Sequence, residues 1–413
     1  MSGVREFRSE DIPEVAQLWM KVFRGRGGPA SEALRAYFRE IFFESPWQDE
    51  SLPSLVYEET DKRIIGFLGV LPRIMTFNKQ RIKVAVATQL MMDKDARADH
   101  AAARLMRKFL AGKQDLSFSD GASEAAEKLW QGVGGDVAVS DYMVWVRVLR
   151  PTQYASLLLS GRSSLLPVVR ALWPVFRALD AVIVRSPLGR RYWLPEVAGT
   201  TVEELPSDET LLWCIRILSG NRALQPEYEL DSLRWLLKRA SEKQMLGELR
   251  KGVIRNGSGE ILGWYLYYIK QGGIGQVLQF GGKPKSIRKV LNHLFCQAWS
   301  QGAVGITGKL ESRFTKELVK SRCGFTWPGY GTLMHSRNKD ILIAIHRGDA
   351  FLSRLEGEWW ARFSDPVWSQ ETRARSLHAW PWMPGLQAPR QNEEPVSPIP
   401  ARAGLHGQFD QPA

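Results

Sequence analysis

A chain of 413 residues is too long for one compact core of ordinary size, so we expect two folded domains with connecting segments. Apolar residues make up 44% of the sequence and charged residues 24%, a balance typical of globular proteins that excludes a chain disordered throughout. The net charge of +12 favours anionic partners, such as a nucleotide-containing cofactor, lipid head groups or nucleic acid.

Cysteine usage and the apolar segments indicate a cytoplasmic protein. Residues 1–11 lack the apolar core of a secretory signal, and the long apolar stretch at 165–184 is interrupted by charges that would be costly inside a bilayer. The three cysteines are too far apart for a disulfide framework or a metal-ligand motif: Cys214, Cys296 and Cys323.

Hydrophobic spacing predicts alternating strands and helices over the first 150 residues. Ile12, Val15 and Leu18 recur at helical spacing, whereas the run from Ile82 to Met92 is rich in valine and leads directly into a helical segment. The predicted order is a strand at 4–7, helices at 11–23 and 31–43, strands at 54–58, 64–77 and 82–92, a helix within 93–112, a strand at 116–119, a helix at 124–131 and a β segment at 136–149.

A similar order begins again near residue 200. It comprises helices at 208–218 and 231–242, strands at 249–255, 261–269 and 275–280, a helix at 286–301 and a strand at 304–307. We therefore expect an α/β (α+β) protein with an N-terminal domain at 1–150, a helical connector at 151–199, a C-terminal domain at 200–365 and a disordered, low-complexity tail at 366–413.

The connector is basic and partly helical. Leucine, valine and tryptophan lie on one side of its helical segments and arginines lie elsewhere, which allows contact with a membrane surface. Its Trp and Leu residues are expected in the core more often than as lipid anchors.

The junction between the strand at 82–92 and the next helix is the most informative motif. A helix N-terminus presents unpaired N–H groups and a positive dipole end to a phosphate, and small residues let the phosphate approach. The run is Arg97, Ala98, Asp99, His100, Ala101 and Ala102. It resembles the R-x-x-G-x-G/A loop of the GNAT acyltransferase superfamily, with His100 standing where a glycine is usual.

Other segments resemble the same superfamily in the expected order. They are VREFRSEDIPEVAQLW, RIIGFLGVLPR and SDGASEAAEKLWQGVGG in the first half, and KELVKSRCGF in the second. The resemblance implies two tandem GNAT-like folds, each a mixed, mostly antiparallel sheet flanked by helices, with a degenerate second copy. In that copy, Gly281, Gly282 and Lys283 are candidates for a phosphate cradle, although their order differs from a P-loop.

The resemblance also implies the chemistry. Acetyl-CoA or another acyl-CoA would be the co-substrate, with Leu90, Met91 and Met92 beside its pantetheine arm. Asp93 or Asp120 could be the general base, or could serve as a turn residue and a helix cap. Trp130 stands where the family often places a tyrosine acid, and an indole N–H does not donate a proton near neutral pH.

Three functions remain open. The first is an N- or O-acyltransferase acting on a small-molecule, sugar or lipid-linked acceptor. The second is a non-catalytic GNAT-like binding or scaffold protein. The third is a Fem-like aminoacyl-tRNA-dependent transferase, because that group also has tandem GNAT folds; only in that case do we expect a nucleic-acid partner, tRNA.

Overall fold

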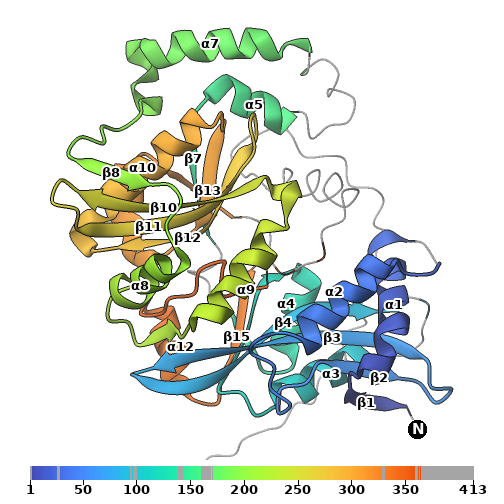
Figure 1. The fold of residues 1–413 in the computed structure, drawn as a ribbon. Helices are drawn as coiled ribbons and strands as arrows, with labels where there is room; N and C mark the ends of the chain where they lie inside the picture. Colours follow the sequence, from blue (N-terminus) through green and yellow to red (C-terminus); the bar gives the residue numbers. More distant parts are fainter. Residues whose placement is uncertain are drawn as a thin grey trace, which may run out of the picture. The chain divides into compact units, whose positions relative to one another are not determined.

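The structure is a computed structural model in which two mixed β-sheets are flanked by helices (Figure 1). The predicted tail at 366–413 lies outside the described residues. The structure describes residues 2–25, 28–93, 95, 100–137, 143–159, 169, 171–327, 331–358, 361 and 363.

The first sheet, sheet A, contains most of the predicted N-terminal strands. Its one parallel pair among the described strands is β4 with β5, and its other pairs are antiparallel. The spatial order is β1 (Gly3–Glu6), β2 (Leu55–Glu58), β3 (Ile64–Phe77), β4 (Gln80–Met92), β5 (Leu116–Ala122), β15 (Gly331–His335) and β6 (Asp136–Val137), with β9 (Leu224–Pro226) pairing beside β3.

Helices pack on both faces of sheet A. One face carries α1 (Ile12–Arg24) and α2 (Glu32–Phe43), and the other carries α3 (Ala101–Leu110) and α4 (Glu124–Gly132). Local sequence sets the ends of these helices. Gly25 ends α1 in the left-handed region at φ +62°, where a side chain would be strained. Ser31 and Ser123 cap α2 and α4 by accepting hydrogen bonds from backbone N–H groups.

The second sheet, sheet B, repeats the mixed arrangement, with β12 and β13 parallel. The order is β14 (Gly324–Thr326), β7 (Val144–Val148), β13 (Gly305–Lys309), β12 (Ile274–Gly282), β11 (Ile261–Ile269), β10 (Glu248–Asn256) and β8 (Thr200–Glu203). Its helices are α8 (Asp208–Leu218) and α9 (Leu230–Ser241) on one face and α10 (Ile287–Ser300) and α11 (Thr315–Lys320) on the other; α12 (Lys339–His346) follows β15.

The two halves of the chain exchange strands. Strand β7 belongs to the first half but pairs with β13 and β14 in sheet B, whereas β15 from the second half pairs with β5 and β6 in sheet A. The segment at 136–149, predicted as one β element, therefore contributes β6 and β7 to different sheets. The expected boundaries at residues 150 and 200 divide the chain in sequence but do not separate the two sheets.

A shared core joins the halves. It combines one face of sheet A with α1 and α2, and one face of sheet B with α8 and α9, and it includes fully buried aromatic residues from both halves such as Phe67, Trp264 and Tyr268. Two further cores lie under α3 and α4 and under α10. Burial of this apolar surface is the main force that holds the sheets in one unit.

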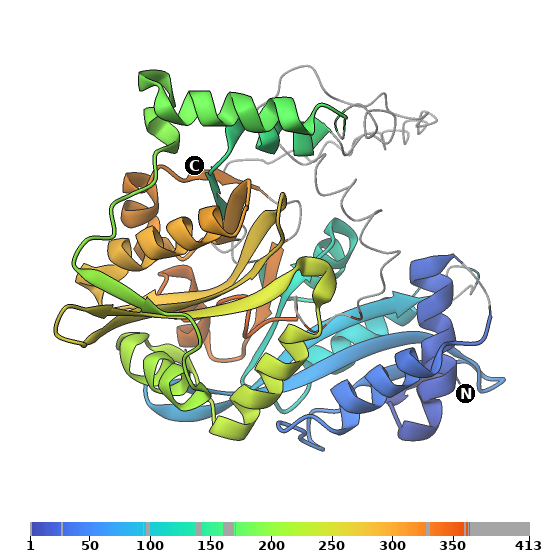
Figure 2. The same ribbon diagram turned by 45° about the horizontal axis from the view of Figure 1, so that its top comes forward.

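The connector consists of α5 (Pro151–Leu159), α7 (Trp173–Arg185) and a 3-10 helix at Pro187–Tyr192 beside sheet B (Figure 2). Trp173 is partly buried against Tyr154 and Val304, as expected of a core residue. Leu172 and Leu179, in contrast, are exposed, which departs from the expectation for connector leucines. In the described part of the chain, no helix is both long and apolar enough to cross a membrane.

The strand exchange predicts that residues 1–150 do not fold alone. Such a fragment loses β15, which leaves the edge of β5 unpaired, and it loses the α8 and α9 side of the shared core. We expect no cooperative thermal transition by circular dichroism, whereas a fragment of residues 1–365 should unfold cooperatively. A sharp unfolding transition of the short fragment would contradict the structure.

Candidate active site

Strands β4 and β5 separate partway along sheet A. They pair in parallel at only three positions, Val84 to Val86 against Leu116 to Phe118. Beyond this point β4 continues to Met92, whereas β5 continues to Ala122 and stays paired with β15. The sheet therefore opens into a V, called here splay A.

A β-bulge lies where the strands part. Gly69 pairs with Thr88 and Phe67 with Met91, so Leu68 alone opposes two residues of β4, and Gln89 adopts a left-handed φ of 51°. The extra residue changes which face the side chains occupy. Val84 and Val86 contact the shared core, but Leu90 and Met92, at positions of the same parity, contact the α3 side.

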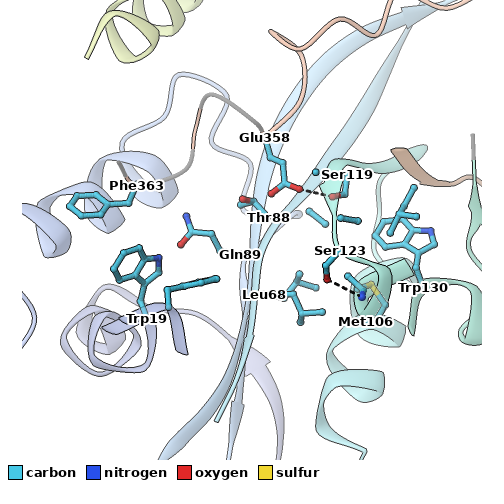
Figure 3. Close-up of a pocket in the computed structure, with 17 residues that line it drawn as sticks. Trp19, Leu68, Thr88, Gln89, Met106, Ser119, Ser123, Trp130, Glu358 and Phe363 are labelled. Carbon is cyan, nitrogen blue, oxygen red and sulfur yellow. Dashed lines mark hydrogen bonds between the residues drawn. The ribbon is translucent and has the colours of Figure 1, made fainter. Parts of the chain in front are cut away.

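A cavity of about 200 Å³ occupies splay A and reaches both faces of the sheet. Figure 3 shows β4 passing between two groups of side chains. Trp19, Gln89 and Phe363 lie on the α1 side, and Met106 and Trp130 lie on the α3 and α4 side. Such a passage lets two molecules meet from opposite faces of one sheet.

A carboxylate from the end of the described chain lines the cavity. Glu358 is 3% exposed, and its Oε1 accepts a hydrogen bond of 2.6 Å from the Ser119 hydroxyl on β5 (Figure 3). Its backbone N–H donates to Oδ1 of Asp120 at 2.7 Å. Asp120 therefore fixes the segment that carries Glu358, while the Glu358 side chain itself lines the cavity.

The bulge also supplies polar atoms. The Thr88 hydroxyl and the Gln89 Oε1 are buried and have no hydrogen-bond partner among the described residues. The Gln89 Nε2 donates to the Tyr37 hydroxyl, which in turn donates to the carbonyl of Ala361 at 2.7 Å. Buried polar atoms without partners are uncommon and favour a site that receives a polar ligand.

Of the residues predicted along the pantetheine arm, Leu90 lines the cavity, whereas Met91 and Met92 pack into the cores on opposite faces of the sheet. Asp93 is not among the lining residues. Its carboxylate contacts Lys21 Nζ at 2.7 Å. Burial would raise the pKa of Asp93, but the hydrogen bonds from Lys21 and the Asp95 N–H outweigh it and lower that pKa.

The predicted phosphate loop is described in part. Arg97, Ala98 and Asp99 lie outside the described residues. His100 is exposed and precedes α3 without capping it through its side chain, while Ala101 is buried and Ala102 is half-buried in the first turn. Small residues in the first turn of a helix allow an anion to approach its N-terminal N–H groups.

Trp130 lines the cavity on the α4 side. Its indole N–H donates to the carbonyl of Met334 on the exchanged strand β15 at 3.0 Å. The N–H is therefore used to hold β15 in place.

Sequence analysis missed Glu358, Ser119, Thr88 and Gln89. Glu358 lies 238 residues from Asp120 and reaches it only through the fold. A usable local signal is Gly357, because a Cβ there would lie 2.0 Å from the Asp120 carboxylate. Only glycine permits that close approach.

Sheet B has a comparable opening, splay B. Strand β12 pairs in parallel with β13 from Ile274 to Val277 and then continues to Gly282, with a bulge at Leu278. Here residues 352–354 of the same chain occupy the opening. The Arg354 N–H donates to the carbonyl of Leu278 at 3.1 Å, and Lys309 Nζ donates to the carbonyl of Leu352 at 2.8 Å.

Glu356 anchors this filling segment. Its Oε2 accepts from the Ser353 N–H and hydroxyl at 2.7 and 2.5 Å, and its Oε1 accepts from Tyr228 at 2.5 Å and Gln279 at 2.9 Å. Burial raises the pKa of Glu356 to about 7, although the hydrogen bonds from Ser353 and Tyr228 act in the opposite direction.

The glycines of the second junction serve packing. A Cβ at Gly281 would meet the Trp264 ring at 2.3 Å, and one at Gly282 would meet the carbonyl of Leu262 at 2.5 Å. Lys283 forms an ion pair with Glu260. These contacts occupy the residues that the sequence suggested as a phosphate cradle.

Comparison with known proteins gives a family match for the N-terminal part of the chain. Residues 3–115 match the model of a family described as an acetyltransferase (GNAT) domain. No curated protein matches the sequence significantly. The N-terminal part of the chain thus matches a GNAT acetyltransferase domain, and this match supports an acyltransferase that uses acyl-CoA.

Solved structures share the fold over most of the chain. A conserved protein of unknown function from Enterococcus faecalis V583, described as a probable N-acyltransferase, aligns with a TM-score of 0.54 at 11% identity, covering 81% of this chain and 72% of its own. A GCN5-related N-acetyltransferase from Anabaena variabilis ATCC 29413 aligns with a TM-score of 0.51 at 12% identity, covering 82% and 74%. At these identities the likeness concerns the fold.

Gly357→Ala should destabilise the protein, because the new Cβ would displace the Asp120 carboxylate or the segment behind it. We expect a loss of about 1–3 kcal/mol in the free energy of unfolding, measured by denaturant titration. Gly324→Ala is the control, since its Cβ would meet its nearest neighbour at 4.0 Å. Equal stability of the two variants would contradict the described contact.

Glu356 should make stability depend on pH. Its pKa is about 7 in the folded protein and about 4.5 ordinarily, so between these values the folded chain retains a proton that the unfolded chain releases. Its contribution is present below about pH 4.5 and is lost as the pH rises through about 7. As the pH rises over this range, the melting temperature of Glu356→Gln should decline less than that of the wild-type protein. An equal decline in the melting temperatures of the two proteins would refute the raised pKa of Glu356.

Proposed function

We propose that acyl transfer takes place in splay A, with Glu358 as the general base. The observation that carries this proposal is the cavity that passes through the splay with a buried carboxylate on its wall. Splay B is filled by residues 352–354 of the same chain. The two openings therefore have different roles.

The residues of splay A fit an acyl-CoA. The Thr88 hydroxyl and the Gln89 Oε1 are buried polar groups without partners among the described residues, and the alanines in the first turn of α3 suit the close approach of the diphosphate. Leu90 would lie beside the pantetheine arm. The bound acyl-CoA supplies a thioester carbonyl that is open to nucleophilic attack.

Glu358 would take the proton of the attacking group. An amine or hydroxyl of the acceptor forms a bond to the thioester carbon while its proton passes to Glu358, directly or through one water. The C–S bond then breaks, and the sulfur leaves as the thiol when it takes up the proton held by Glu358, directly or through water. Ser119 orients the carboxylate through its 2.6 Å hydrogen bond, and Asp120 holds the backbone of Glu358.

This assignment changes the role we give to the predicted bases. Asp120 becomes a positioning residue, because its Oδ1 already accepts the Glu358 N–H. Asp93 becomes an ion-pair partner of Lys21 that secures the end of β4. Neither side chain is among those that line the cavity.

We also propose that the two halves are tandem GNAT-like folds. Each sheet has a parallel pair that parts at a bulge, β4 with β5 and β12 with β13. In the second copy the segment around Glu356 takes the place that a cofactor would occupy. That copy then serves to hold the C-terminal segment and with it Glu358.

The acceptor is proposed to be a small molecule, sugar or lipid-linked intermediate with a free amine or hydroxyl. Trp19, Phe23 and Phe363 line the cavity on the α1 side. Aromatic rings of this kind pack against sugar faces as well as hydrocarbon. The basic connector is a further candidate for contact with a membrane surface.

Glu358→Gln tests the catalytic assignment. The amide keeps the shape but cannot accept a proton, so CoA release with an acceptor panel should fall about a hundredfold or more in kcat. Acetyl-CoA affinity by isothermal titration should stay near that of wild type.

Glu356→Gln is the matched control, because the Glu356 carboxylate is also buried and lies two residues before Glu358, but does not line the cavity in splay A. It should retain most of kcat. Undiminished turnover of Glu358→Gln would refute the base assignment. Absence of acyl-CoA binding by the wild-type chain would refute splay A as the acyl-CoA site.

A further inference from the structure

The connector carries a strongly one-sided charge. Between residues 151 and 195 the sequence has a single acidic residue, Asp180, and six arginines: Arg162, Arg170, Arg177, Arg185, Arg190 and Arg191. Of these, Arg177, Arg185, Arg190 and Arg191 are described and all are exposed.

Asp180 does not offset this charge at the surface. It is 4% exposed, and its carboxylate accepts from the Thr152 N–H at 2.7 Å, the Gln153 N–H at 3.1 Å and the Gln153 side chain at 2.9 Å. It thereby caps α5 and ties α7 to it. Between residues 151 and 195, the exposed charged side chains that the structure describes are therefore all arginines.

Helix α7 also presents an apolar stripe to solvent. Leu172, Val175, Leu179 and Val182 follow one another at intervals of three or four residues, which places them on one side of the helix. Their exposed fractions are 43%, 51%, 45% and 66%. Trp173 and Asp180 occupy the other side, where they contact α5 and sheet B.

Basic and aromatic groups border the stripe. Because an α-helix turns by about 100° per residue, Arg185 lies at one edge of the stripe. Arg190 and Arg191 follow in the 3-10 helix after α7. The Arg190 guanidinium lies 5.8 Å from the ring centroid of Trp193, which is 44% exposed. Arginine and tryptophan together are typical of the interface between lipid and water.

We propose that α7 and the 3-10 helix after it, residues 172–193, dock on an anionic lipid bilayer. The stripe enters the boundary between head groups and acyl chains, while the arginines contact the negative head groups. A nucleic acid would use the arginines but leave the stripe in water, so the apolar side chains favour lipid. This docking is independent of the acyl-transfer chemistry.

The test is co-sedimentation of the full chain with vesicles. We expect binding to phosphatidylcholine vesicles that contain phosphatidylserine, much weaker binding to phosphatidylcholine alone, and a decrease with added salt. The substitutions Arg185→Gln and Arg190→Gln should each weaken vesicle binding about fivefold.

The double variant Val175→Ser, Val182→Ser should weaken vesicle binding at least about tenfold. Val319→Ser is the matched control, because Val319 is 55% exposed on α11 and should leave binding unchanged. Acetyl-CoA affinity should be the same in all variants, which separates this proposal from the transfer site.

Three results would overturn the proposal. The first is failure of the wild-type chain to sediment with phosphatidylserine vesicles. The second is wild-type vesicle binding by Val175→Ser, Val182→Ser, which would leave charge alone as the cause. The third is salt-sensitive binding to tRNA that displaces the protein from vesicles, which would assign the arginines to nucleic acid.

Discussion

The parting of β4 from β5 is the constraint on which the site depends. Three residue pairs hold the strands together, and the bulge at Gln89 then turns β4 away from β5. A flat sheet would have satisfied the backbone of Thr88 to Met92 with ladder hydrogen bonds and left no space. The bulge gives up that pairing and leaves a passage between the two faces of the sheet. In the proposed reaction, the two substrates enter this passage from opposite faces and meet.

Segments from the second half of the chain complete the walls of this opening. Strand β15 closes the free edge of β5, and the segment that follows α12 crosses splay B before it delivers Glu358 to splay A. Glu356 and Glu358 are two residues apart and reach different openings. The second half of the molecule thus contributes to a site whose walls are otherwise built by the first half.

Sequence patterns predicted most elements because those signals are local. The strand at 64–77 and the helix at 208–218 match the structure residue for residue, since alternation and helical spacing are read within one segment. Partner choice is not local. The valine-rich pattern of Val144–Val148 predicts a strand but does not specify its sheet. Glu358 was missed for the same reason, because its contact with Ser119 depends on a path through both halves.

Hydrogen–deuterium exchange of the wild-type chain with and without acetyl-CoA tests the central claim most directly, because it distinguishes the two openings in one experiment. The account predicts new protection of backbone amides in β4 from Thr88 to Met92 and in the first turn of α3, with little change in β12 and β13. Protection confined to β12 and β13, or none in β4, would contradict splay A as the acyl-CoA site.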